Sequence, residues 1–142
     1  YSKVGEFMKK KNGFTLIELL AVIVILAIIL VIAVPKILSV INDATKNSFE
    51  SSLKMIASSA EKDYQIKIIK GETPANGNCE AVATVDAGLK GTVCSVTYGT
   101  TEDTKGTAVV AVTTAPTSGK FKGCIGTYNS ATQTFTTEVT CS

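Results

Sequence analysis

The residue with the clearest chemical potential is a carboxylate set inside an apolar run. Between Phe14 and Val34 only Thr15 and Glu18 are polar, and no Lys or Arg lies within the run. A carboxylate well inside a membrane helix costs about 2.5–3.5 kcal/mol on insertion scales, so such a residue usually has a partner and a function. Glu18 is therefore the first candidate functional residue. Its position alone also allows a bystander that snorkels to the membrane surface.

The cysteines form the second candidate group, and all of them lie in the second half of the chain: Cys79, Cys94, Cys124 and Cys141. The sequence has no His and no C-x-x-C pair, which argues against a zinc site. An even number favours disulfides, and four cysteines allow three pairings. Four reduced structural thiols are the alternative, because the compartment is inferred rather than seen.

Enzymatic chemistry is not indicated. Ser and Lys are plentiful, but no nucleophile lies in a recognisable activating motif and His is missing. Asp86, or Glu102 with Asp103, could bind calcium, although isolated loop acids are more often simply solvated. We therefore expect a protein that is not an enzyme and that needs no metal or cofactor.

The apolar run predicts a membrane-spanning helix. Residues 14–34 are enough to cross a hydrocarbon core at about 1.5 Å per residue. A secretory signal peptide has an apolar region of about 7–15 residues, with a small-residue cleavage site behind it. Here the run is longer, the small residue Gly13 lies ahead of it, and Val31-Ile32-Ala33 is a poor cleavage site before Val34-Pro35. A spanning helix therefore fits better than a signal peptide.

Positive charge is concentrated before this run. The first 13 residues carry +3 and the remaining 129 carry −1, so a basic field suited to nucleic acid is absent from the larger part. Lys9-Lys10-Lys11 directly follow Met8. We interpret Met8 as the natural start and residues 1–7 as a remnant of cloning. A genuinely longer leader is the alternative.

The leader and the start of the run together resemble the precursors of type IV pilins and the related pseudopilins. Those proteins have a short basic leader that ends in Gly, then Phe-Thr-Leu-Ile-Glu and a long apolar helix. This chain has Lys9-Lys10-Lys11-Asn12-Gly13 followed by Phe14-Thr15-Leu16-Ile17-Glu18, without a departure. The resemblance is strong over roughly residues 9–54 and then fades.

This resemblance implies a processing site and an assembly residue. A membrane aspartyl peptidase would remove residues 8–13 by cutting between Gly13 and Phe14, and would N-methylate Phe14. Glu18 would then be the fifth mature residue, which pairs with a terminal amine during assembly. The pairing makes physical sense because it would neutralise two charges in an apolar environment and set the stagger of one helix against the next.

The helix is expected to continue well past the apolar run. Pro35 lies where pilin helices commonly bend, although from its chemistry a helix end at the membrane surface is equally plausible. Over residues 35–70 apolar residues recur at three- and four-residue spacing, which predicts an amphipathic continuation. The stripe comprises Leu38, Ile41, Thr45, Phe49, Leu53, Ile56, Ala60 and Tyr64. Gly71 suits the helix stop, so we expect one helix from about Phe14 to Lys70.

Residues 71–142 are expected to form a small antiparallel β-sheet head packed on the amphipathic half of the helix, an α+β fold. The candidate strands are Val82–Val85, Thr92–Tyr98, Thr107–Thr113, Phe121–Tyr128 and Thr134–Thr140, with turns at residues 100–105 and 129–132. Of the three cysteine pairings, Cys79–Cys94 and Cys124–Cys141 are favoured, because both close short loops and because C-terminal loop disulfides recur in pilins.

The sequence thus predicts a structural subunit of a type IV pilus-like filament that supports adhesion, motility or DNA uptake. Its expected partners are membrane lipid before assembly, the prepilin peptidase, the pilus assembly machinery and other copies of itself in a helical filament; a head ligand is unknown. The subunit would begin as a single-pass protein of the cytoplasmic membrane, with its head outside, and end in an extracellular filament. A pseudopilin of a secretion or competence system is the nearest alternative, and a non-polymerising membrane-anchored binding head is a more distant one.

The predicted cleavage site is open to a direct test. We expect Gly13→Val to leave a full-length, membrane-held precursor and no filaments, because the peptidase needs a small residue to reach the backbone beside the membrane surface. Immunoblotting and N-terminal sequencing of the product measure this. Mature protein that begins at Phe14 in the variant would contradict the assignment.

Overall fold

The structure is a computed structural model that describes residues 12–82, 89 and 94–142. The chain divides into two compact units, Tyr1–Ser39 and Val40–Ser142. One helix, α1 (Leu16–Ile69), runs through both units. A short helix and five strands follow it within the second unit.

Helix α1 has recognisable signals at both ends. It begins directly after Thr15 and ends in a Schellman motif, in which Glu72 N donates to Lys67 O (2.9 Å) and Gly71 N donates to Ile68 O (3.0 Å). Gly71 has φ = +77°, a conformation that glycine adopts without strain. The expected helix from about Phe14 to Lys70 is confirmed to within two residues. The helix continues through Pro35, so the alternative of a helix end at this residue is wrong.

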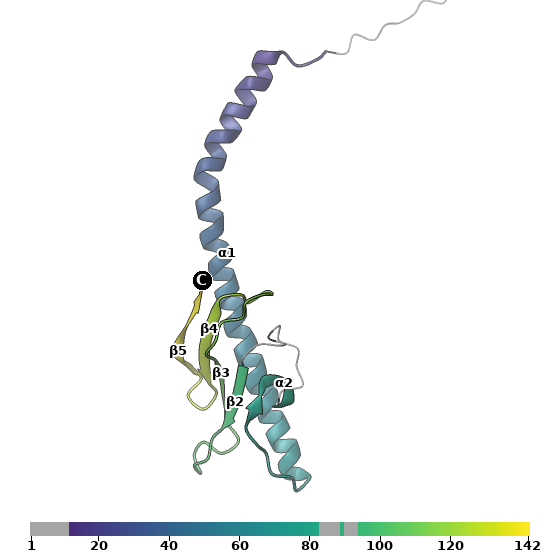
Figure 1. Cartoon of the computed structure of the whole chain (residues 1–142), viewed down its shortest axis with the longest axis vertical. Coiled ribbons are helices and arrows are strands. Elements are labelled where there is room, and N and C mark those ends of the chain that lie inside the picture. Colours follow the sequence, from purple (N-terminus) through teal and green to yellow (C-terminus); the bar gives the residue numbers. More distant parts are fainter. Residues whose placement is uncertain (1–11, 83–88, 90–93) are drawn as a thin grey trace, which may run out of the picture. The chain divides into compact units, whose positions relative to one another are not determined.

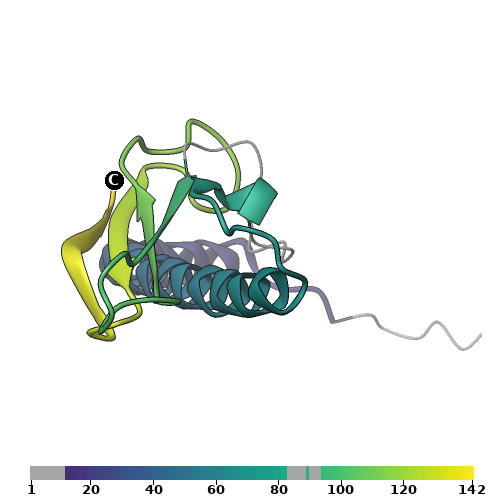
Figure 2. The same cartoon turned by 90° about the horizontal axis from the view of Figure 1, so that it is seen from below.

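The strands form one antiparallel sheet in which spatial order follows chain order (Figure 1). They are β1 (Gly77–Asn78), β2 (Cys94–Tyr98), β3 (Ala108–Val112), β4 (Cys124–Asn129) and β5 (Thr134–Cys141), and α2 (Cys79–Val82) lies between β1 and β2. Seen from below, the sheet lies along one side of the helix as a second layer (Figure 2). The predicted α+β fold, a long helix with a small antiparallel sheet packed on it, is confirmed.

The core lies between the sheet and one face of α1. Burial alternates along β2, β3 and β4, as expected for strands with one face on a core. The helix contributes Phe49, whose ring meets that of Phe121 edge-on with centroids 5.4 Å apart. A Cβ at Gly126 would lie 2.7 Å from a methyl carbon of Val139 and 3.3 Å from Phe49. Glycine at this position therefore lets Phe49 of the helix and Val139 of β5 pack directly against the backbone of β4.

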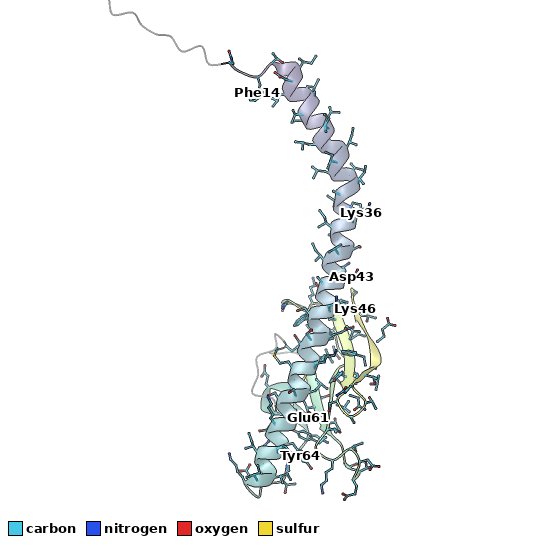
Figure 3. The ribbon with its side chains drawn as sticks, turned by 180° about the vertical axis from the view of Figure 1, so that it is seen from behind. Phe14, Lys36, Asp43, Lys46, Glu61 and Tyr64 are labelled. Atoms are coloured by element: carbon cyan, nitrogen blue, oxygen red, sulfur yellow. A yellow bond between two sulfur atoms is a disulfide. The ribbon has the colours of Figure 1, made fainter. Side chains whose placement is uncertain are left out.

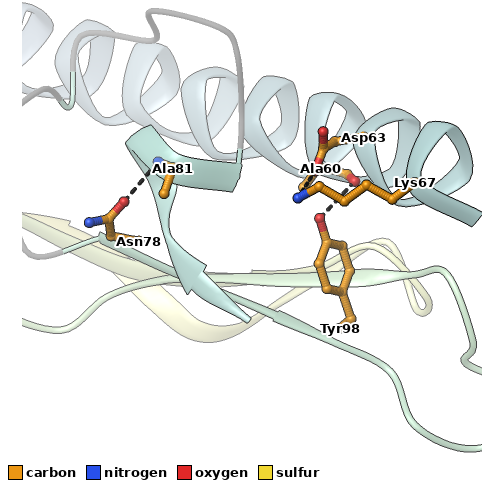
Figure 4. Close-up of polar contacts among 6 residues, drawn as sticks. All are labelled: Ala60, Asp63, Lys67, Asn78, Ala81 and Tyr98. Carbon is orange, nitrogen blue, oxygen red and sulfur yellow. Dashed lines mark hydrogen bonds and ion pairs between the residues drawn. The ribbon is translucent and has the colours of Figure 1, made fainter. Parts of the chain in front are cut away.

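Two strand predictions are corrected by the structure. Val82 belongs to α2 rather than to a strand, because the Asn78 side chain accepts a hydrogen bond from Ala81 N (2.8 Å) and caps a helical turn (Figure 4). The rest of that predicted strand, residues 83–85, lies outside the described residues. Strand β4 begins at Cys124 and not at Phe121, since residues 121–123 form a turn that buries the Phe121 ring.

A buried phenol links the sheet to the helix. The Tyr98 hydroxyl donates to the carbonyl oxygen of Ala60 (3.0 Å), and Tyr98 is only 5% exposed (Figure 4). Burial, together with the nearby charge of Asp63, raises the pKa of Tyr98 to about 12. Asp63 itself pairs with Lys67, one helical turn away, at 2.8 Å. The hydrogen bond therefore survives as long as the phenol stays protonated.

This raised pKa predicts a loss of stability at alkaline pH. Tyr98 has a folded pKa of about 12 and an unfolded pKa near 10, so its contribution is complete below about pH 10 and is lost as pH rises toward 12. We expect Tyr98→Phe to be about 1 kcal/mol less stable than wild type near pH 8, because the variant lacks the hydroxyl that makes the hydrogen bond. The difference should vanish or reverse near pH 12.

Urea unfolding of the full chain in non-ionic micelles, followed by circular dichroism at a series of pH values, measures both free energies of unfolding. Absorbance titration of the phenols should show one high-pH component that disappears in Tyr98→Phe. A stability difference that does not change with pH would contradict the assignment.

Candidate functional site

The first turn of α1 closes on itself through Thr15 and Glu18. The backbone N–H and the hydroxyl of Thr15 both donate to Glu18 Oε2, each at 3.2 Å, and Glu18 N donates to Thr15 Oγ1 at 3.3 Å. These reciprocal bonds are the capping box, in which two otherwise unbonded amides of a helix start are satisfied by side chains. The cap explains why the helix starts at Leu16.

The cap also fixes where the carboxylate points. Both bonds from Thr15 go to Oε2, and Oε1 has no hydrogen-bond partner among the described residues. The helix dipole favours negative charge at this end. Glu18 is therefore held at the start of the helix by Thr15, the residue that follows Phe14, with one oxygen open to another molecule.

The apolar part of the helix is exposed, because the described residues do not cover it. No residue of its most apolar 18-residue stretch is buried within the chain, and the helix is long and apolar enough to cross a membrane by length and composition. The side chains that follow Phe14 radiate from the ribbon on every side (Figure 3). Such a surface is stable only when lipid or another protein covers it.

The predicted cleavage site lies in an accessible segment. Phe14 is 90% exposed, and a Cβ at Gly13 would meet nothing within 4 Å. The chain's own packing therefore makes no demand for glycine at position 13. The basic residues Lys9–Lys11 lie outside the described residues. Pro35 lies within α1, and the bend expected there remains a prediction.

Both disulfides of the head join the pairs that the sequence favours. Cys79 is bonded to Cys94 and Cys124 to Cys141, with Cα atoms 5.4 Å and 4.0 Å apart. The second pair is also a residue pair of the β4–β5 ladder. Each disulfide thus fastens segments that already lie side by side.

The calcium alternative gains no support from the described part of the chain. Glu102 and Asp103 are exposed in the β2–β3 loop, and Asp86 lies outside the described residues. No group of three or more His, Cys, Asp or Glu side chains that could hold a metal ion occurs among the residues described.

Sequence reasoning identified Glu18 but missed its local partner. The spacing Thr15-x-x-Glu18 before an apolar run is itself the signature of a capping box and could have been found from the sequence. The structure brings together Thr15 and Glu18 at the helix start. The cysteine pairs belong to the second unit.

Comparison with known proteins agrees with the geometry of the helix start. Residues 8–34 match the family model described as the prokaryotic N-terminal methylation motif, which is the signature of type IV pilin and prepilin-like proteins. The motif indicates a type IV pilin-like or pseudopilin protein, with a structural role. No curated protein and no solved structure matches the chain.

The capping box yields a test of the site. We expect Thr15→Val to fray the first turn of α1, because it removes the hydroxyl that joins Glu18 in both directions, at a cost of about 1 kcal/mol. Amide hydrogen exchange of the full chain in micelles should accelerate at Glu18 and Leu19, whose amides bond to Thr15, and not at residues 25–30. Thr15→Ser, which keeps the hydroxyl, should behave as wild type; equal fraying in both variants would contradict this role.

Proposed function

We propose that this chain is a structural subunit of a type IV pilus-like filament, released from its precursor by cleavage between Gly13 and Phe14. The observation that carries the proposal is the combination of the methylation motif with an apolar stretch of α1 in which the described part of the chain buries no residue. Lipid would cover this helix before assembly. In the filament, the same helix of neighbouring copies would cover it.

Cleavage would change the electrostatics of the helix start. A new amine at Phe14 places a positive charge in the apolar environment, next to the turn that holds Glu18. An unpaired buried charge is costly, and pairing with an opposite charge recovers much of that cost. Since Glu18 Oε2 is engaged by Thr15, Oε1 is the oxygen available to the amine of a neighbouring copy.

Such a pair would fix the axial stagger between neighbouring helices. Apolar helices slide past one another with little change in free energy, because one apolar contact replaces another. A single polar pair in an apolar seam penalises every other stagger, as a buried polar residue does in coiled coils. The proposed roles of Phe14 and Glu18 are therefore to set the rise between subunits as well as to neutralise charge.

The peptidase, the assembly machinery and the outward placement of the head belong to the same proposal. The motif suggests processing by a prepilin peptidase and assembly with other pilin subunits, and one apolar helix near the N-terminus fits a membrane-anchored protein. A pseudopilin would use the same helix start. Filaments sheared from the cell surface would favour a pilin, whereas loss of secretion or transformation without surface filaments would favour a pseudopilin.

Substitution of Glu18 separates charge from capping. We expect Glu18→Ala and Glu18→Gln to insert and to be cleaved normally, since the Gly13–Phe14 bond is untouched and a costly charge is gone. Both should fail to assemble as the sole subunit, because removing one partner of a buried pair costs about 3–5 kcal/mol. Shearing and electron microscopy measure filament yield.

Glu18→Gln is the informative variant because glutamine still serves in a capping box. Failure of both variants would mean that the negative charge is required. If Glu18→Gln assembles and Glu18→Ala does not, the role of Glu18 is limited to capping the helix. Normal filament yield from either variant as the only subunit would overturn the proposed charge pairing.

A further inference from the structure

The head carries a groove at one end of α1, between the helix and the loop that joins β2 to β3. Its lining includes Glu61, Lys62, Gln65 and Ile66 from the helix, and Lys105 and Thr107 from the loop. Figure 3 labels Glu61, which belongs to this lining, and Tyr64 nearby on the helix. Its volume of about 640 Å³ lies within the range of sites for small organic ligands.

The loop side of the groove is held in place by its own backbone. Gly99 N donates to Thr107 O (3.0 Å) and closes the loop at its base, and Thr104 N donates to Thr101 O (3.1 Å) within it. Gly106 has φ = +86°, and a Cβ there would lie 3.3 Å from the side-chain nitrogen of Gln65. The absence of a side chain lets the loop lie against the helix, so the groove is already formed in the free chain.

Charged side chains of both signs line the groove, and they differ in the contacts that they already make. Lys62 and Lys105 are exposed, and neither has an ion-pair partner among the described residues. The carboxylate of Glu61 also belongs to the lining, and one of its oxygens accepts a hydrogen bond from the hydroxyl of Ser130, which itself accepts a bond from Ala108 N (2.9 Å). The lining thus carries two ammonium groups from distant parts of the sequence and one carboxylate, so its formal charge is positive and the two ammonium groups can bind an anion.

We propose that this groove binds a sugar ring that bears an anionic group, a carboxylate or a phosphate. The two ammonium groups supply the charge for the anion, and the Gln65 amide and the Ser58 hydroxyl supply hydrogen bonds for ring hydroxyls. Ile66 and the methylene stems of the lysines offer apolar surface for the ring's C–H face. A lone inorganic anion would leave most of the volume empty. The ligand is either a free sugar acid or one unit of an acidic polysaccharide.

Binding is measured on the full chain in non-ionic micelles by isotope-edited NMR, with galacturonate, trigalacturonate, neutral maltotriose and inorganic phosphate as probes. We expect galacturonate and trigalacturonate to shift the amide signals of Gly106 and Thr107 and the side-chain amide of Gln65. Maltotriose should shift them much less, and phosphate should bind more weakly than galacturonate. Tighter binding of trigalacturonate would identify the polysaccharide as the source, and equal binding would identify the free sugar acid.

Variants that remove charge but keep length test the two lysines. Lys62→Gln and Lys105→Gln should each weaken galacturonate binding about two- to fivefold, and the double variant about tenfold. The matched control is Lys122→Gln, which removes an exposed lysine of the head outside the groove and should leave binding within about twofold. Unchanged amide spectra elsewhere in the head show that the variants are folded.

Three outcomes would overturn the proposal. Equal weakening by Lys122→Gln would show attraction to overall charge rather than to this groove, and equal binding of maltotriose would show that the anion is not recognised. Unchanged binding in the double variant together with lost filament assembly would mean that the two lysines contact a neighbouring copy instead. The binding experiment does not depend on assembly, so failure of the proposed filament would leave its result valid.

Discussion

The rest of the molecule depends on one constraint: none of the described residues covers the apolar part of α1. Every large apolar side chain from Phe14 to Val34 is about half exposed or more. Burying each such side chain is worth about 1.5–3 kcal/mol relative to water, so the segment as a whole cannot remain in water. This segment must therefore be covered by a membrane, by a bundle with other chains, or by each in turn.

Glu18 is the exception within that surface, and its surroundings show how the exception is tolerated. The carboxylate lies in the first turn, where the helix dipole favours negative charge, and it accepts two bonds from Thr15. These contacts lower the cost of carrying a charge into an apolar environment, and they leave one oxygen unused. Neutral hydrogen bonds offset only part of the cost of desolvating the Glu18 carboxylate. We infer that the cap orients this carboxylate and that a cation is still needed to neutralise it.

Periodicity explains why much of the fold was predictable. Strands β2, β3 and β5 alternate or are rich in Val and Thr, and α1 repeats apolar residues along one stripe up to Gly71, so local pattern and tertiary environment agree there. Predictions failed where a side-chain contact overrides the pattern. Asn78 caps a helical turn at Val82, and the Phe121 ring enters the core from a turn. The groove was not predictable either, because only the path of the β2–β3 loop places Lys105 in the same lining as Lys62.

The order of the strands favours folding of the head through contacts that are local in the sequence. Each strand pairs with its neighbour in sequence, so every ladder closes a short loop at a small entropic cost. The disulfides span 15 and 17 residues and join segments that the sheet has already brought together. In the chain-entropy model each such loop stabilises the head by about 3 kcal/mol. Because the core uses only one face of α1, we infer that the head can complete its fold on a helix whose apolar part stays in the membrane. In the proposed filament pathway, that order would keep the apolar segment covered by lipid until neighbouring copies replace it.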